Sequence, residues 1–140
     1  MNLRIKKLHS DAIIPSYAHE GDAGMDLFSL EKVVIEPNTQ VSLATGIALE
    51  IPEGYVGLIW DKSGLSHKHR LKTFGGVVDA GYRGEVRIGI MNLSDTSYVF
   101  EKGHKIAQML IQPVVSATIT ESDNLSDSSR GEGGFGSTGK

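Results

Sequence analysis

Short runs rich in Val, Ile and Leu recur along the whole chain, and most end at a cluster of Gly, Pro, Asn or Asp. Runs of this length and composition favour β-strands, and the clusters favour turns. Strands are predicted at residues 3–8, 32–35, 41–50, 55–60, 74–78, 85–92, 97–100 and 105–120. Short strands separated by regular turns are typical of a sandwich or a barrel, so the chain is predicted to be all-β.

Helical periodicity is almost absent, and only residues 63–70 indicate a short helix. The chain has 140 residues, the size of one domain, and shows no internal repeat that would indicate a solenoid. From residue 121 onward the composition changes to Ser, Asp and Gly with little apolar content. We therefore divide the chain into a folded core, residues 1–120, and a flexible Gly-rich C-terminal tail, residues 121–140.

Composition and charge exclude several classes of function. The chain has no cysteine, which rules out disulfides, thiolate metal ligands and a thiol nucleophile. A net charge of -3 gives no general electrostatic reason to bind a nucleic-acid polymer, although a single nucleotide stays open. The sequence has neither the apolar run of a signal peptide nor a stretch long enough to span a membrane. We expect a cytoplasmic protein that binds no membrane.

The tail carries two phosphate-binding patterns in the wrong context. Residues 131–136 match a dinucleotide fingerprint and residues 134–140 match most of a P-loop. Each pattern needs a strand before it and a helix after it, so neither match is expected to be genuine. The glycines would still let backbone amides approach an anion, Arg130 could grip phosphate, and Phe135 could stack on a base. The tail is either a disordered terminus or a lid over a nucleotide.

Polar residues also stand where the predicted strands break into loops. Asp79 follows a strand, where it is either a turn former or a base that activates water. Residues 61–64 form either a polar turn or a compact anion site. Asp26 and Gln108 lie among apolar residues, so each needs a partner if buried. The histidines form no obvious cluster of metal ligands.

Five motifs follow one another in a definite order. They are Ala23-Gly24-Met25-Asp26-Leu27, then Lys62-Ser63-Gly64-Leu65, then Gly76-Val77-Val78-Asp79 with Tyr82 and Gly84, then Lys102-Gly103 with Ile106-Ala107-Gln108, and finally residues 130–139. Together they resemble the five motifs of the trimeric dUTPase family. The resemblance spans nearly the whole chain.

This resemblance implies a jelly-roll-like β-sandwich that forms a homotrimer, with active sites at subunit interfaces and the tail closing over a site built by other chains. It implies hydrolysis of dUTP to dUMP and pyrophosphate, which limits uracil in DNA and supplies dUMP for dTMP synthesis. By position, Asp79 would activate the water that attacks the α-phosphorus, and Asp26 would organise the site. The Mg²⁺ cofactor would be held by the substrate phosphates and water, with no direct protein ligand.

The resemblance also assigns the substrate contacts. Phosphate oxygens would be held by Lys62, Ser63, Gly64 and Gln108 of the core and by Arg130, Gly136 and Ser137 of the tail. Uracil would be read by a hairpin that contains Thr73, Phe74, Gly76, Val77 and Val78, with a floor too narrow for the methyl group of thymine. Tyr82 would pack under the deoxyribose and exclude a ribose 2′-hydroxyl, while Phe135 would stack on uracil.

Two positions depart from the family pattern, and two rival functions follow. Lys62 stands where an arginine is usual, which replaces a bidentate fork by a point charge. Gly81 stands where an acidic residue is common, so residues 79–82 also look like the corresponding loop of the dCTP deaminases. A deaminase, or a bifunctional enzyme, would use Glu85 as its acid/base group. The other rival is a non-catalytic β-sandwich that binds a ligand.

Overall fold

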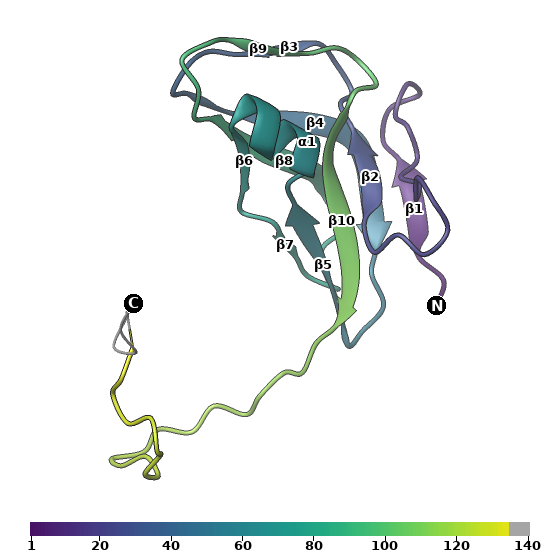
Figure 1. The fold of residues 1–140 in the computed structure, drawn as a ribbon. Coiled ribbons are helices and arrows are strands. Elements are labelled where there is room, and N and C mark those ends of the chain that lie inside the picture. The colour runs from purple at the N-terminus through teal and green to yellow at the C-terminus, as the bar shows by residue number, and fades with distance from the viewer. Residues whose placement is uncertain (135–140) are drawn as a thin grey trace.

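A computed structural model describes residues 1–134, which contain ten strands and one short helix (Figure 1). The elements are β1 (Arg4–Lys7), β2 (Met25–Phe28), β3 (Val33–Ile35), β4 (Gln40–Glu50), β5 (Tyr55–Trp60), α1 (Ser63–His69), β6 (Leu71–Phe74), β7 (Val77–Val78), β8 (Glu85–Asn92), β9 (Tyr98–Phe100) and β10 (Lys105–Pro113). The prediction of an all-β protein with a short helix after residue 62 is confirmed.

The strands form two four-stranded sheets and one two-stranded sheet. The first sheet has the order β1-β4-β8-β6, the second has the order β2-β10-β5-β7, and β3 pairs with β9. Every strand pair is antiparallel. Since neighbours in each sheet are distant in sequence, residues from all parts of the chain meet at the same sheet edges.

The core lies between the apolar faces of these sheets. Strand β8 shows the reason most clearly, because Val86, Ile88 and Ile90 are buried and the residues between them are more exposed. This is the period of two that a strand with one buried face requires. Each fully buried aliphatic side chain stabilises the fold by about 1.5–3 kcal/mol. The core also contains Leu27, Ile35, Leu43, Ile47, Phe100, Ile106 and Met109.

Asn92, at the end of β8, is fully buried but has all its polar atoms satisfied. Its Nδ2 donates to the carbonyl oxygens of Ile35 at 3.0 Å and Thr96 at 2.8 Å. Its Oδ1 accepts from the backbone N–H of Ser94 at 2.9 Å. A buried amide is tolerated only when bonded in this way, so Asn92 joins β8, β3 and the following loop.

Three local expectations were wrong. Strand β2 was not predicted, because its four residues include a carboxylate and are buried without alternation. The last strand ends at Pro113 rather than at residue 120. The expected hairpin at 73–78 is a corner between sheets, since β6 pairs with β8 and β7 pairs with β5.

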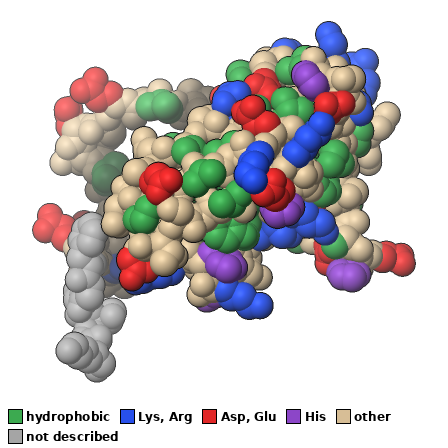
Figure 2. Space-filling model, turned by 90° about the horizontal axis from the view of Figure 1, so that it is seen from above, with side chains coloured by type: hydrophobic (Ala, Val, Ile, Leu, Met, Phe, Trp, Pro, Cys, Tyr) green, Lys and Arg blue, Asp and Glu red, His purple; other side chains and the backbone are tan. Residues whose placement is uncertain are grey.

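Surface features of the described part are mixed in charge. Figure 2 shows Lys and Arg side chains interspersed with Asp, Glu and His over the face seen from above. Within residues 1–134 no helix is both long and apolar enough to cross a membrane. After β10 the chain leaves the body of the sandwich, and Val115, Ile119 and Leu125 on this segment are more than nine-tenths exposed (Figure 1).

Candidate active site

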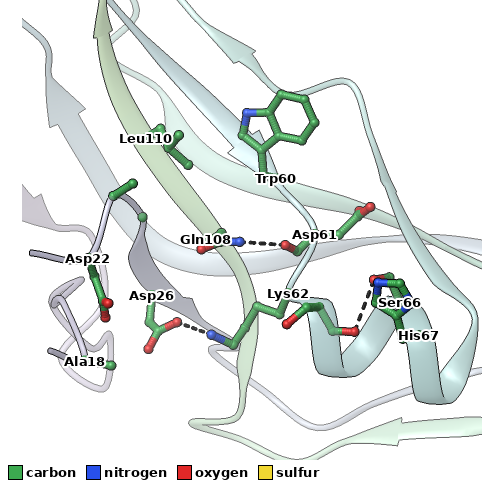
Figure 3. A pocket seen from close by; sticks show the side chains of 13 residues that line it. Ala18, Asp22, Asp26, Trp60, Asp61, Lys62, Ser66, His67, Gln108 and Leu110 are labelled. Atoms are coloured by element: carbon green, nitrogen blue, oxygen red, sulfur yellow. Dashed lines mark hydrogen bonds and ion pairs between the residues drawn. The ribbon is translucent and has the colours of Figure 1, made fainter.

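A hollow of about 610 Å³ opens beside β2, β10 and the start of α1 (Figure 3). We call it the lysine hollow. Its polar lining includes Asp26, Asp61, Lys62, Ser63 and Gln108. It therefore brings together four of the residues that the sequence assigned to phosphate binding or to organising the site.

Asp26 is only 3% exposed, yet it is charged. Lys62 donates a hydrogen bond to its Oδ1, and Nζ of Lys105 lies 2.6 Å from Oδ2 in an ion pair without hydrogen-bond geometry. Burial alone would raise the pKa of Asp26, but the two lysines beside its carboxylate, Lys105 and Lys62, outweigh it and hold the pKa below its usual value. Asp26 thus fixes Lys62 at the edge of the lysine hollow, as Figure 3 shows.

Ser63 and Gly64 form the first turn of α1, directly after Lys62 in extended conformation. The first N–H groups of a helix have no partner within the helix, so they can donate to an anion. Ser63 lines the lysine hollow, whereas Gly64 is not among its lining residues. The turn can offer backbone N–H groups and a hydroxyl, both of which suit phosphate oxygens.

Gln108 lies in β10, opposite Asp26 of β2 and Trp60 of β5. Its Nε2 donates to the backbone oxygen of Asp61 at 2.8 Å (Figure 3). A Cβ at Gly24 would collide with the Gln108 side chain, so this glycine makes room for the amide. The arrangement explains why a glycine precedes Asp26 in the first motif.

A second hollow, of about 250 Å³, lies against β5, β7 and β8. We call it the aspartate hollow, and it is lined by Gly76, Val77, Val78, Asp79, Tyr82 and Glu85, among others. Asp79 follows β7 directly and is exposed. Within residues 1–134 its carboxylate has neither a hydrogen bond nor an ion pair, so its oxygens are free to accept a proton.

Tyr82 is held by the tight turn that follows Asp79. Its backbone N–H donates to the backbone carbonyl oxygen of Asp79 at 3.1 Å, and its hydroxyl donates to the backbone carbonyl oxygen of Glu85 at 3.0 Å. The ring covers Gly84, where a Cβ would overlap the ring and hydroxyl. The glycine at this position therefore sets where the Tyr82 ring can lie.

The corner between β6 and β7 is shaped by two glycines in left-handed conformation. Gly75 has φ 70° and Gly76 has φ 103°, values that L side chains rarely adopt. The N–H of Ile59 donates to the Gly76 oxygen at 2.8 Å. A Cβ at Gly76 would lie 3.1 Å from the Ile59 oxygen, so the floor of the corner has no room for a side chain.

The two hollows share no lining residue, although a third connects them. That hollow, of about 230 Å³, is lined by Trp60, Thr73, Gly76 and Val77 among others. It shares Trp60 with the lysine hollow and Gly76 and Val77 with the aspartate hollow. Phe74 lies apart from all three, with its ring over Gly89.

The tail residues lie elsewhere. Arg130 is on the segment that leaves the sandwich, outside all three hollows, and its Nε donates to the Gly133 oxygen at 2.7 Å. Phe135, Gly136 and Ser137 fall outside the described residues. The roles expected of these four residues stay predictions.

Sequence reasoning placed Asp61 in a polar turn or anion site but gave its carboxylate no role, and it assigned no role to Trp60 or Lys105. Asp61 and Trp60 were visible only as the residues before the second motif, and Lys105 only as the start of a strand. Their positions depend on contacts with β6, β10 and β2 that no local pattern reveals. Spacing in the fourth motif could have drawn attention to Lys105, because a lysine next to a buried strand can pair with a buried acid.

A model of the dUTPase family matches residues 10–139. The chain belongs to the dUTPase family. The resemblance of the five motifs is thereby confirmed, and so is the jelly-roll-like sandwich, since solved dUTPases have the same fold.

Similar dUTPases include curated and structurally characterised proteins. The deoxyuridine 5′-triphosphate nucleotidohydrolase of Clostridioides difficile is 48% identical over 99% of this chain and 98% of its own length. That of Clostridium tetani (strain Massachusetts / E88) is 49% identical over 99% of this chain and 97% of its own. The dUTPase of Staphylococcus bacteriophage 80alpha with dUpNHpp has a TM-score of 0.94 and 37% identity, covering 99% of both chains.

A further dUTPase structure concerns a metal. A variant dUTPase from phage phi11 of S. aureus has a TM-score of 0.82 and 33% identity, covering 89% of this chain and 98% of that one. Its structure describes the coordination of a structural Mg(II) ion.

Proposed function

We propose that this dUTP nucleotidohydrolase splits dUTP into dUMP and pyrophosphate by means of a water molecule that Asp79 activates. The observation that carries this proposal is the exposed carboxylate of Asp79, which has no hydrogen bond or ion pair to residues 1–134 and lies in the aspartate hollow beside the Gly76 corner and Tyr82. A free carboxylate next to a narrow base-sized recess can bind a water molecule and take its proton. Family membership supplies the substrate class.

In the proposed reaction, Asp79 accepts a proton from water as the water oxygen bonds to the α-phosphorus. The bond from that phosphorus to the bridging α,β-oxygen breaks, and pyrophosphate leaves with the electron pair. Phosphoryl transfer depends mainly on positioning and on neutralising charge. Lys62, the N–H groups of Ser63 and Gly64, and the Gln108 amide would hold the phosphate chain.

Magnesium would supply charge neutralisation on the phosphates when bound. Among residues 1–134 no three His, Asp or Glu side chains form a group that could hold a metal ion. Asp26, the acid nearest the phosphate groups, is already paired with Lys62 and Lys105. This arrangement fits an Mg²⁺ ion that is held by the substrate phosphates and water. Asp26 would affect the ion only indirectly, through the positions of Lys62 and Lys105.

Base and sugar selection would come from the aspartate hollow. The corner from Thr73 to Val78 would offer backbone groups to uracil, and its floor would be too narrow for an added methyl group. The close approach of Gly76 to the Ile59 backbone supports a narrow floor. The Tyr82 ring is held by the hydrogen bond from its hydroxyl to the backbone oxygen of Glu85, and it would exclude a ribose 2′-hydroxyl. We place Phe135 over uracil, and Arg130, Gly136 and Ser137 over the phosphates.

The assembly would be a homotrimer. Residues expected to act on one substrate are divided between two hollows without a common lining residue. We infer that complete sites form at interfaces, where the lysine hollow of one protomer meets the aspartate hollow of another and a tail covers both. The free nucleotide substrate is consistent with a cytoplasmic location.

The deaminase alternative has less support. Glu85 would have to exchange protons with the base, but its Oε1 accepts from the N–H of Gly46 at 2.8 Å and its Oε2 from Arg87 at 2.9 Å. Both oxygens are therefore engaged, Oε1 in joining β8 to β4 and Oε2 in a pair with Arg87 of the same strand. We assign Glu85 to support of the strands beneath the aspartate hollow.

Pyrophosphate release from dUTP, dCTP, dTTP and UTP in the presence of Mg²⁺ tests the proposal. We expect release from dUTP alone. Ammonia release from dCTP would instead place the protein with the deaminases. Absence of pyrophosphate from all four, with binding retained, would identify a non-catalytic binder.

A further inference from the structure

Asp61 lies between β5 and α1, and both oxygens of its partly buried carboxylate have bonding partners. Its Oδ1 accepts from the backbone N–H of Thr73 at 2.7 Å and from the Thr73 hydroxyl at 2.6 Å. Its Oδ2 pairs with Nζ of Lys72 at 2.5 Å. The side chain is 19% exposed, so these bonds are only partly open to water.

These bonds cross from one sheet to the other. Asp61 follows β5 in the second sheet, whereas Thr73 belongs to β6, the edge strand of the first sheet. Thr73 is also the residue at which the chain enters the corner. Asp61 therefore fixes the beginning of the corner to β5.

The other end of the corner is fixed to the same strand. Val77 and Val78 pair with Leu58 and Gly57 of β5, and the Gly76 oxygen accepts from Ile59. Without the Asp61 side chain, the corner would keep its exit bonds to β5 and lose its entry bonds to Asp61, so that its entry would be held only by the pairing of β6 with β8. Gly75 and Gly76 between the two ends have no side chains to stiffen this segment.

The backbone of Asp61 belongs to the lysine hollow. Its oxygen accepts from Nε2 of Gln108 at 2.8 Å (Figure 3), and Lys62 and Ser63 follow it directly. One residue thus contacts Gln108 through its backbone and the corner through its carboxylate. These contacts of Asp61 resist movement of the corner relative to the lysine hollow.

We propose that Asp61 is a positioning residue that sets the depth of the corner, and so determines how strongly the enzyme rejects a pyrimidine with a 5-methyl group. The proposal rests on the function proposed above, in which the corner reads uracil. Asp61 itself does not contact the substrate. It acts through the two bonds to Thr73.

The charge of the carboxylate suits this role. Burial alone would raise the pKa of Asp61, but bonds from Lys72 and Thr73 outweigh it and hold the pKa below the usual value. The carboxylate stays ionised at neutral pH and accepts all three bonds. An asparagine could keep the two bonds from Thr73 through its single oxygen, whereas an alanine could keep none.

The test compares kcat/KM for dUTP with kcat/KM for dTTP in wild-type protein and in Asp61→Ala, Asp61→Asn and Lys72→Ala. We expect Asp61→Ala to lower the dUTP preference about tenfold, because a corner displaced by a fraction of an ångström admits the methyl group. The Asp61→Asn variant should retain most of the wild-type preference for dUTP over dTTP. Lys72→Ala is the matched control, since it removes an ion pair to the same carboxylate and leaves both Thr73 bonds.

Each result decides between the alternatives. A folded Asp61→Ala variant with unchanged preference would overturn the role of Asp61, and so would an equal loss of preference in Lys72→Ala. If Asp61→Ala does not fold, Thr73→Val removes only the hydroxyl bond and should lower the preference to a smaller extent; unchanged preference there would overturn the role. A wild-type protein that does not prefer dUTP would instead overturn the proposed function.

Discussion

At the scale of single residues, the pairing of Asp26 with two lysines bears on the departure at Lys62, where the family pattern led us to expect an arginine. A lysine is a point charge on a flexible stem and lacks the fixed fork of a guanidinium. Here Asp26 restrains Lys62 by a hydrogen bond, and Lys105 adds a second positive charge to the same carboxylate. The restraint compensates for part of the order that an arginine would bring.

The low pKa of Asp26 predicts how its contribution to stability changes with pH. Because the folded-state pKa lies below the unfolded value, the contribution is complete above the unfolded pKa and is lost as pH falls through the folded pKa. Asp26→Asn should therefore lower the free energy of unfolding by about 2 kcal/mol at pH 7 and by less near pH 3. Urea unfolding at both pH values measures this, and an equal difference at the two would contradict it.

Asp79 predicts a separation of turnover from binding. Asparagine keeps the shape of the side chain but cannot accept a proton from water, so Asp79→Asn should lower kcat by about a thousandfold. The Kd for dUTP should change little, because the phosphates are held elsewhere. Pyrophosphate release and calorimetric titration measure the two quantities. Turnover close to that of the wild type would exclude Asp79 as the base.

At the scale of elements, the turn from Asp79 to Glu85 positions Tyr82 by contact with Gly84. Gly84→Ala places a methyl group where the Tyr82 ring lies. The ring must move, so we expect the preference for dUTP over UTP to fall about tenfold. Gly81→Ala is the control in the same turn, because a Cβ there meets nothing within 4 Å. Equal effects from the two variants would show that the turn, rather than the ring, sets the preference.

The elements also show which features a sequence can predict. Strand β8 follows from alternating Val86, Ile88 and Ile90, and α1 from the residues after Lys62. Strand β2 escapes prediction because pairing with β10 on one edge, rather than any alternation of its own, makes it a strand. Residues 114–120 have the composition of a strand, but a strand also needs a neighbour, which the sequence cannot supply.

The candidate site divides in the same way. Asp26, Asp79 and Gln108 could be selected because they belong to motifs in a known order. The bond between Asp61 and Thr73 could not, since it joins strands of different sheets. Likewise, the separation of the site residues into two hollows depends on the arrangement of the two sheets, which cannot be read from any single motif.

At the scale of the whole molecule, one chain presents two incomplete hollows and a segment with bare apolar residues. Val115 and Ile119 are 92% and 95% exposed. Their exposure is consistent with a segment that lies against another chain in the assembly proposed above. The proposed homotrimer would cover them and complete the hollows together.

Removal of the tail should separate folding from catalysis. Residues 121–134 contain one large apolar residue, Leu125, and it is 91% exposed, so they add little to the core. A chain ending at residue 120 should melt at nearly the wild-type temperature and remain a trimer by light scattering. Its pyrophosphate release should fall about a hundredfold, because groups expected to cover the substrate are gone. Dissociation of the truncated trimer would show that the tail has a structural role instead.

Strand β10 places Gln108 directly across from Asp26 on one side and Trp60 on the other. The relative positions of these three residues in the lysine hollow are therefore defined by strand register, and they do not depend on the lengths of the loops between them. Insertions and deletions in those loops leave the row intact, so they can accumulate during evolution. A single deletion within β10 before Gln108 would turn every later side chain to the opposite face. A change in the length of this strand therefore affects the site and the core together, because Ile106, Ala107 and Met109 of β10 are buried.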